Sequence, residues 1–246
     1  MSQFLNFQVN MLNQTQGTLN LSDGYDCQEC KNKGFTYFVR GDEVVSRLCA
    51  CRQKRRAIRI INELNIGGGN LRMESFKTSL PWQELIKKTA KSFLEAGSGW
   101  FFIGGQSGCG KTHICTAISY ELIERERSVV YMRWVDKSQQ IKQSLKYGTY
   151  TDEINKYKRC DVLYIDDLFK CAGGEGISTS DLKIAFEILN YRYADTSKIT
   201  IISSEYTLSA LAQIDEACAS RIIERTGNHN VNIDKDVNKN LRRKIG

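Results

Sequence analysis

Short apolar runs alternate with longer amphipathic segments from residue 82 to the end of the chain. The apolar runs predict strands at residues 100–103, 129–134, 162–165, 199–203 and 231–233. Apolar residues at helical spacing predict helices between them, at residues 82–95, 111–126, 136–158, 180–193 (with Ser180 as its cap) and, in two pieces, 208–225. Repeated strand-then-helix units predict an α/β fold, with a parallel sheet covered by helices on both faces.

The first 64 residues follow a different pattern. Residues 1–22 hold no charged side chain, and their apolar positions fit neither period well, so we interpret them as a mobile tail, with a short partner-docking segment as the alternative. Alternation over residues 35–39 and a turn at Gly41-Asp42 predict a small β-ribbon, and residues 52–64 predict a basic helix. Three glycines followed by Asn70 predict a linker. The predicted domains are residues 1–66 and 67–246.

Composition narrows the class of protein. The 246 residues are 41% hydrophobic and 26% charged, which is ordinary for a globular protein and argues against disorder. Every apolar run is shorter than the roughly 18–20 residues that span a bilayer, and the N-terminus lacks the pattern of a secretory signal. We therefore expect a cytosolic protein with no membrane partner. The net charge of +7 suits contact with nucleic acid without requiring it.

Residues 105–112 match the phosphate loop G-x-x-x-x-G-K-[ST] at every fixed position, between a predicted strand and a predicted helix. The glycines allow backbone N–H groups to surround phosphate oxygens at a helix N-terminus. Lys111 is predicted to reach the β- and γ-phosphates of ATP, and the Thr112 hydroxyl to bind Mg²⁺. The predicted nucleotide-binding residues are Gly105, Gln106, Ser107, Gly108, Cys109, Gly110, Lys111, Thr112 and His113.

The strand at 162–165 ends in two carboxylates, Asp166 and Asp167. The carboxyl edge of such a sheet is where ligands bind. Asp166 is therefore predicted to be the second magnesium residue, and Asp167 to orient or deprotonate the attacking water. ATP hydrolysis is the predicted reaction. A P-loop kinase or other small-molecule phosphotransferase is an alternative enzyme class.

Nine cysteines fall into two groups. Cys27-x-x-Cys30 and Cys49-x-Cys51 form two close pairs on either side of the predicted ribbon, a spacing typical of a tetrahedral zinc site. The metal would also stabilise a module too small for its own core. A redox Cys-x-x-Cys and unrelated buried thiols are the alternatives. The dispersed thiols are predicted to pack as small apolar groups: Cys109, Cys115, Cys160, Cys171 and Cys218.

With two later motifs, Ser203-Ser204-Glu205 and the segment from Ser220 to Arg225, the chain resembles the AAA+ ATPases of the DnaC/DnaI helicase-loader family, phage-encoded members above all. The resemblance covers about residues 70–233, and the N-terminal cysteine module has counterparts in the family. It implies a P-loop NTPase with an AAA+ core, preceded by a small zinc-ribbon-like domain. Because the chain ends about 20 residues after Arg225, a reduced or absent lid is expected.

The resemblance also implies roles for single residues. Ser204 matches the sensor of the γ-phosphate, with Ser203 or Glu205 as alternatives. Arg221 matches the arginine finger, which reaches the ATP of a neighbouring subunit. Arg225, or a solvated Arg221 with no such role, is the alternative. Two aspartates in place of the more common Asp-Glu lead us to expect slow turnover, with ATP acting as a switch.

The implied function is the loading of a replicative DnaB-type hexameric helicase onto single-stranded DNA by an ATP-bound ring or spiral, in the bacterial cytosol or, for a phage-encoded protein, in the host cytosol. Residues 1–64 are the expected helicase-docking surface. The alternatives are an IstB-type transposition-helper ATPase and a pure adaptor. Three groups of residues are the expected DNA contacts, with ordinary surface charge as the alternative interpretation of each. The first group lies in or near the segment between the second and third strands and comprises Lys137, Lys142, Lys146, Lys156, Lys158, Lys170, Tyr147, Tyr150 and Tyr157. The others are the C-terminal Lys239, Arg242, Arg243 and Lys244, and the basic helix with Arg52, Lys54, Arg55, Arg56 and Arg59.

Overall fold

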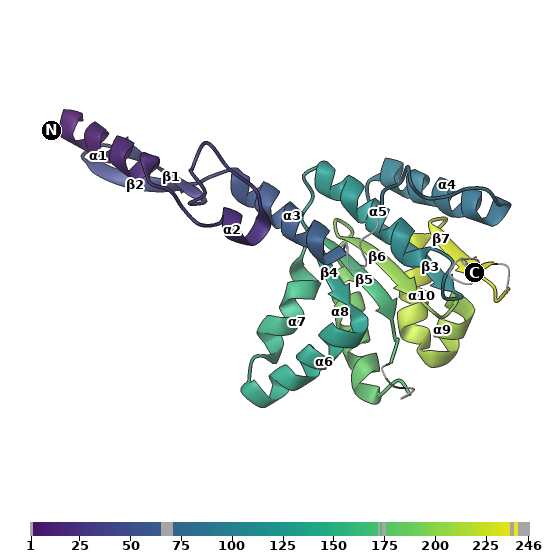
Figure 1. The fold of residues 1–246 in the computed structure, drawn as a ribbon. Helices are drawn as coiled ribbons and strands as arrows, with labels where there is room; N and C mark the ends of the chain where they lie inside the picture. The colour runs from purple at the N-terminus through teal and green to yellow at the C-terminus, as the bar shows by residue number, and fades with distance from the viewer. Residues whose placement is uncertain (1, 65–70, 172, 174–175, 237–238, 241–246) are drawn as a thin grey trace. The chain divides into compact units, whose positions relative to one another are not determined.

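A computed structural model of the chain describes residues 2–64, 71–171, 173, 176–236 and 239–240 (Figure 1). The chain divides into two compact units, Met1–Glu63 and Leu64–Gly246, and each is described by itself. The predicted domain boundary after residue 66 and the predicted linker lie outside the described residues. None of the helices in the described part of the chain combines the length and apolar composition that a bilayer crossing needs.

The N-terminal unit consists of a helix, a two-stranded antiparallel ribbon and a second long helix. Its elements are α1 (Ser2–Gln14), α2 (Asn20–Asp23), β1 (Phe35–Arg40), β2 (Glu43–Leu48) and α3 (Cys51–Leu64). The ribbon and the basic helix agree with the predictions. The mobile-tail interpretation of the first residues is wrong, because most of that segment is helix α1.

Contacts distant in sequence hold α1 in place. The Asn13 side chain donates to the carbonyl of Tyr37 and accepts from its N–H, both at 2.8 Å. The Lys33 ammonium donates to carbonyls at the end of α1, including that of Leu12. These contacts fix a helix whose own apolar spacing is irregular, and they leave Phe4 and Phe7 63% and 62% exposed.

The C-terminal unit is a parallel five-stranded sheet in the order β4-β5-β6-β3-β7 (Figure 1). The strands are β3 (Trp100–Gly105), β4 (Val129–Arg133), β5 (Val162–Leu168), β6 (Ile199–Ser204) and β7 (Asn230–Ile233). The helices are α4 (Pro81–Ala96), α5 (Lys111–Glu124), α6 (Trp134–Ser144), the short η1 (Leu145–Tyr147), α7 (Tyr150–Arg159), α8 (Thr179–Tyr193), α9 (Leu208–Ile214) and α10 (Glu216–Thr226).

Two helical layers cover this sheet, as predicted. Helices α4 and α5 pack against one face, and α6, α7, α8 and α10 lie on the other. Side chains alternate along β5, so Leu163 and Ile165 join the larger apolar cluster while Tyr164 faces the α5 side. The cap of helix α8 lies two residues earlier than expected, because Ser178, and not Ser180, forms a capping box with Asp181. The described residues after β7 belong to no α-helix.

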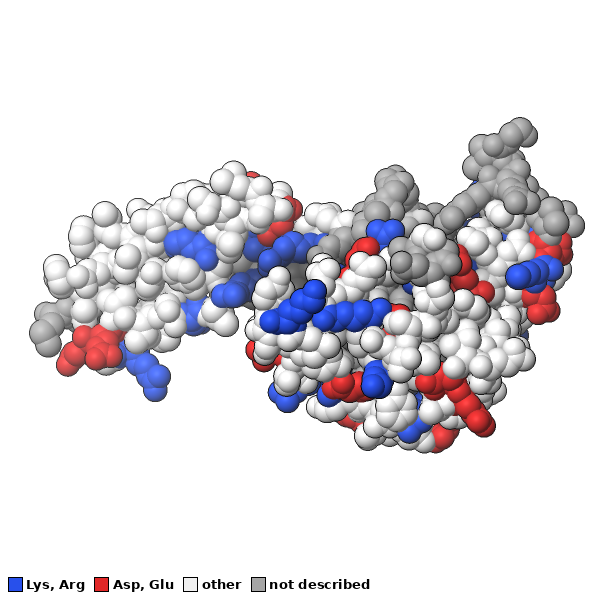
Figure 2. Space-filling view, turned by 90° about the horizontal axis from the view of Figure 1, so that it is seen from below, with Lys and Arg blue, Asp and Glu red and all other residues white. Residues whose placement is uncertain are grey.

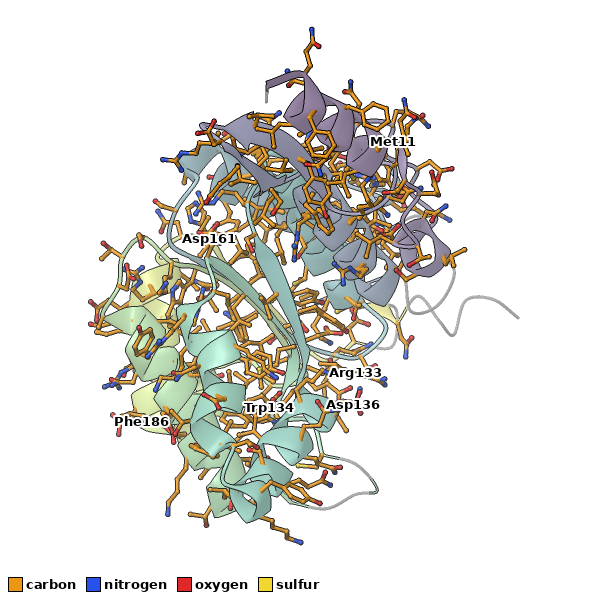
Figure 3. All side chains as sticks on the ribbon, turned by 90° about the vertical axis from the view of Figure 1, so that its left-hand side faces the viewer. Met11, Arg133, Trp134, Asp136, Asp161 and Phe186 are labelled. Carbon is orange, nitrogen blue, oxygen red and sulfur yellow. The ribbon has the colours of Figure 1, made fainter. Side chains whose placement is uncertain are left out.

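Polar contacts join the amino ends of several strands. The Arg192 guanidinium is fully buried and donates to backbone carbonyls at the end of α7 and the start of β5 and β6, and to the Thr200 hydroxyl. Arg127 forms two hydrogen bonds, of 2.6 and 2.8 Å, with the Asp161 carboxylate. In Figure 3, Asp161 lies at the end of the sheet opposite Arg133, which marks the carboxyl edge.

Candidate nucleotide and metal sites

The phosphate loop runs from the end of β3 into the first turn of α5. Gly110, the residue before the helix, has φ +92°, a conformation that a side chain would strain. At Gly105, a Cβ atom would lie 2.0 Å from the carbonyl oxygen of Ile233 on the neighbouring strand. Both positions therefore require glycine. The loop places the free N–H groups of the α5 N-terminus at the carboxyl edge, a favourable position for phosphate oxygens.

Lys111 is 6% exposed, and its ammonium donates to the carbonyls of Gly105 and Gln106, each at 2.8 Å. The lysine is thus folded back over its own loop. Thr112 follows it in the first turn of α5, with a partly buried side chain. A cation beside a row of backbone N–H groups is a donor set that fits a triphosphate.

The other loop residues have separate contacts. The Gln106 side chain accepts from the N–H of Asp236 at 2.6 Å, and the Cys109 thiol donates to the Gln106 carbonyl. His113 faces away from the loop: its Nε2 lies 3.0 Å from the Arg72 carbonyl oxygen. A pocket of about 740 Å³, large enough for a nucleotide, lies beside the loop and is lined by Gly105, Gln106, Ser107, Glu205, Tyr206, Thr207, Ala210, Ile233, Asp234, Lys235, Asp236 and Asn240.

Asp166 lies near the carboxyl end of β5 and is 6% exposed. Its Oδ1 accepts hydrogen bonds from the hydroxyls of Tyr164 and Ser203, both at 2.7 Å, and its Oδ2 accepts one from Tyr131 at 3.0 Å. Burial first, and the Asp166 charge second, raise the pKa values of both tyrosines, so they remain neutral donors. A carboxylate held by hydroxyl donors offers oxygen ligands of the kind that magnesium takes.

Asp167 is held differently. Its backbone is in the left-handed region, with φ +57°, where the pairing of β5 with β6 is irregular. Its Oδ2 lies 2.9 Å from the Lys170 ammonium, which also contacts Glu205 at 2.9 Å. The predicted water-orienting carboxylate is thus held in an ion pair through its Oδ2.

The three sensor candidates at the end of β6 have different partners. The Ser203 hydroxyl donates to Asp166. The Ser204 hydroxyl donates to the carbonyl of Leu168 and so supports the turn after β5. Glu205 pairs with Lys170. Because β6 lies between β3 and β5, Ser203 is the candidate that the structure brings to the Asp166 carboxylate.

Arg221 lies across α8 of its own chain. Its Nε donates to the Asn190 side chain at 3.0 Å, and its guanidinium lies over the rings of Phe186 and Tyr193. Arg225 instead lies over Trp100, at the amino end of β3 and away from the phosphate loop. Within one chain, neither arginine reaches the carboxyl edge in the described contacts.

The four predicted cysteine ligands come together in the N-terminal unit. Their Sγ atoms all lie within 4.8 Å of one another, with Cys27–Cys49 at 3.8 Å and Cys30–Cys51 at 3.4 Å. A tetrahedral site with Zn–S bonds of about 2.3 Å requires S···S distances of about 3.8 Å. All four thiols are buried. The cluster therefore fits a four-thiolate metal site.

The cysteines of this cluster differ in how easily they ionise, and neighbouring donors favour the thiolate of Cys30. Although burial opposes ionisation, the Gly34 N–H, which donates to Cys30 Sγ at 3.2 Å, and the adjacent thiols lower the pKa of Cys30 to about 7. Burial raises the pKa of Cys49. Arg55, a residue considered for DNA contact, is instead buried with Asp23 and adds a positive charge beside Cys51. A bound dication would lower all four thiol pKa values.

The expected DNA contacts are only partly available. Six lysines in or near the segment between β4 and β5 were expected to contact DNA. Four of them form ion pairs: Lys142, Lys156, Lys158 and Lys170. Tyr157 is buried. Lys146 is exposed and Tyr147 is 79% exposed, both in η1. Most of the C-terminal basic run lies outside the described residues. Basic and acidic side chains intermingle over the face of the C-terminal unit that Figure 2 shows. Because Lys146 and Tyr147 are both exposed, η1 is the more specific candidate.

Two residues at the site were not predicted from the sequence. Tyr164 stands two positions before Asp166 and therefore on the same face of β5, so strand alternation could have identified it. Tyr131 lies opposite Tyr164 on β4, and only the strand register brings it to the carboxylate. Both tyrosines contact Asp166.

Comparisons with known proteins agree with this geometry. A model of the family described as IstB-like ATP binding protein matches residues 24–244. The chain is 31% identical over 214 residues to the phage-like element PBSX protein XkdC of Bacillus subtilis (strain 168), covering 81% of this chain and 79% of that protein.

Solved structures show the same core. The replication initiator DnaA bound to AMPPCP and single-stranded DNA matches with a TM-score of 0.55 and 30% identity, over 67% of this chain and 50% of that chain. The crystal structure of DnaI matches with a TM-score of 0.55 and 23% identity, over 70% and 93%, a likeness of fold alone. The chain spans about half the length of the two AMPPCP-bound DnaA chains it matches. The predicted P-loop NTPase fold with an AAA+ core is confirmed.

Proposed function

The chain belongs to the family of IstB-like ATP binding proteins and is an ATPase, and from this premise we propose that it loads a replicative hexameric helicase onto single-stranded DNA in an ATP-controlled manner. The observation that carries the proposal is the carboxyl edge of the sheet, where the phosphate loop and the buried Asp166 lie on either side of β6, the strand that carries Ser203.

We assign the chemistry to residues at that edge. Lys111 and the α5 N-terminus bind the phosphates, while Thr112 and Asp166 hold Mg²⁺. The ion, when bound, neutralises charge that develops on the phosphate oxygens. Asp167 orients the attacking water once Lys170 releases it. Ser203 connects the γ-phosphate position to Asp166, and Ser204 supports the backbone behind it.

Arg221 is proposed to act on the nucleotide of a neighbouring subunit in a ring or spiral. It lies on α10, far along the chain from the phosphate loop, and is held by aromatic rings and Asn190, an arrangement that presents a guanidinium at a surface. Lys146 and Tyr147 of η1 are the proposed contacts with single-stranded DNA, because an exposed aromatic ring beside a cation suits base stacking. Zinc is the proposed ion of the cysteine cluster.

The N-terminal unit is the proposed helicase-docking surface. Helix α1 exposes Phe4, Phe7 and Met11, which lie at i, i+3 and i+7 on one face, and the first 22 residues carry no charge. Met11 is labelled in Figure 3. An ordered, uncharged apolar stripe suits a protein groove better than a polyanion.

Co-purification with the replicative helicase, with and without ATP, tests the proposal. We expect retention that depends on nucleotide, loss of that dependence in Lys111→Ala, and loss of retention in a Phe4→Ala/Phe7→Ala variant. Leu145→Ala, which removes an equally exposed apolar side chain from the other unit, is the matched control. Should neither condition retain helicase, the loader assignment is wrong while the ATPase assignment stands.

A second candidate is a transposition helper of the IstB type, which the family description itself favours. Such a protein would be retained by a transposase and would bind duplex DNA. Parallel capture with helicase and transposase, and a comparison of single-stranded with duplex DNA at one salt concentration, separates the two functions.

A further inference from the structure

The Asp166 carboxylate is surrounded by hydroxyl groups from three strands. Tyr131 comes from β4, Tyr164 from β5 and Ser203 from β6. A carboxylate has about four lone-pair positions for partners. Tyr164 and Ser203 take the two on Oδ1, and Tyr131 takes one on Oδ2. The position that remains is therefore on Oδ2.

Packing leaves the two tyrosines little freedom to do anything else. Tyr164 is fully buried, and a buried phenol needs a hydrogen-bond partner. Tyr131 lies directly opposite Tyr164 in the β4–β5 register, and the two ring centroids are 5.2 Å apart. Each phenol carries one proton, and both protons are directed to Asp166. Any rotation of the carboxylate would break these buried hydrogen bonds.

The adjacent carboxylate provides an internal contrast. Asp167 is paired with the cation Lys170, whereas the contacts of Asp166 are with neutral hydroxyls. Neutral donors orient a carboxylate without cancelling its charge. That is the arrangement expected around a group that must bind a cation in one direction.

We propose that Tyr131 and Tyr164 are positioning residues of the magnesium site, whose hydroxyls clamp the Asp166 carboxylate so that its remaining Oδ2 position is the one offered to the ion. The inference rests on the proposed function, in which Asp166 holds Mg²⁺. It assigns to both tyrosines an effect on the metal and none on the phosphates.

The test is a pair of titrations with a fluorescent ATP analogue. The nucleotide Kd is measured in EDTA, and the Mg²⁺ concentration for half-maximal tightening is measured separately. In Tyr131→Phe and Tyr164→Phe the Mg²⁺ midpoint should rise about tenfold, the usual cost of losing a group that orients a metal ligand. The Kd in EDTA should not change. Tyr150→Phe is the matched control, since its hydroxyl donates to the Glu187 carboxylate at the same 2.7 Å.

Asp166→Asn separates failure of this inference from failure of the proposed function. If Asp166→Asn raises the midpoint and both Tyr→Phe variants match wild type, the positioning role is refuted and the proposed site remains. If the nucleotide Kd of the tyrosine variants in EDTA rose by the same factor as their Mg²⁺ midpoint, the tyrosines would have a merely structural role, which would also overturn the inference. A midpoint unchanged in Asp166→Asn overturns the magnesium role of Asp166 and the inference with it.

Discussion

The two units of this chain differ in the side chains that form the interior of each. In the N-terminal unit, the described apolar cluster consists of four cysteines with Tyr25 beside them. In the C-terminal unit, aromatic and aliphatic side chains from the sheet and the helices on one face form a large cluster. From this difference we propose that the first fold depends on a bound ion, whereas the second depends on hydrophobic burial.

Removing the ion is the strongest way to test that difference. We expect about one zinc per chain, and chelation should unfold the N-terminal unit, because structural zinc contributes on the order of 10 kcal/mol to such modules. Hydrogen exchange should become fast in β1 and β2 and stay slow in β3, β5 and β6. Cys30→Ser should act like the chelator, and Cys160→Ser, outside the cluster, should not. Unchanged exchange in the ribbon after complete metal removal would remove the contrast between the units.

A substitution of Arg192 tests what stabilises the C-terminal unit. Arg192→Met leaves several buried carbonyls at the amino edge of the sheet without their donor, so the free energy of unfolding of the C-terminal unit should fall by about 3 kcal/mol. Arg159→Met, an exposed arginine on α7, should change it by less than about 0.5 kcal/mol. Urea denaturation measures both. Equal losses would mean that Arg192 has no special structural role.

A substitution of Lys170 tests whether ion pairs at the carboxyl edge open during ATP turnover, unlike the contacts at the amino edge. Lys170→Met removes the ion pairs of Asp167 and Glu205. Because Asp167 can then orient the attacking water without first losing a partner, ATP turnover should rise roughly threefold to tenfold, which is a fraction of the full contribution of a positioned general base. Phosphate release at saturating ATP measures it. Lys156→Met, which removes a surface ion pair on α7, is the control. A slower Lys170→Met variant would show that the lysine assists the reaction.

The smallest effect concerns Asp161 at the amino edge. The Arg127 hydrogen bonds come first among the causes that lower its pKa, so the ion pair stabilises the fold above the unfolded value of about 3.9, and this stability is lost as pH falls through the lower folded value. Both side chains are about one-third exposed, so Asp161→Asn should cost at most about 1 kcal/mol at pH 7. In urea denaturation the cost should shrink as pH falls through the lowered folded pKa of Asp161 and disappear below it, and Arg127→Gln should show the same pH dependence. A cost independent of pH would contradict the ion-pair origin.

Local patterns in the sequence predict much of the fold. The five strands and the helices between them follow from periodicity, and the positions of the phosphate loop and Asp166 follow from the rule that strand ends share an edge. The four cysteines come together because two short pairs flank a ribbon. Each of these inferences needs only a few adjacent residues.

Contacts between residues far apart in the sequence could not be predicted from the sequence. Helix α1 depends on Asn13 meeting the backbone of Tyr37, and the contact of Tyr131 with Asp166 depends on strand register. A local contact was missed as well: the pairing of Asp167 with Lys170, three residues along the chain, accompanies a left-handed backbone at Asp167 within β5, which β-propensity does not indicate. Such features follow from tertiary packing, which single-sequence patterns do not encode.

Equilibrium binding of ATP with and without Mg²⁺ tests most directly the claim that the carboxyl edge of the C-terminal sheet is the nucleotide site. Wild type should bind ATP, and Lys111→Ala should weaken the affinity roughly tenfold to a hundredfold in both conditions, the range expected for a lost charge-assisted contact. Asp166→Asn should lose only the part of the affinity that depends on Mg²⁺. Equal affinities in all three proteins, or no binding by wild type, would contradict the account.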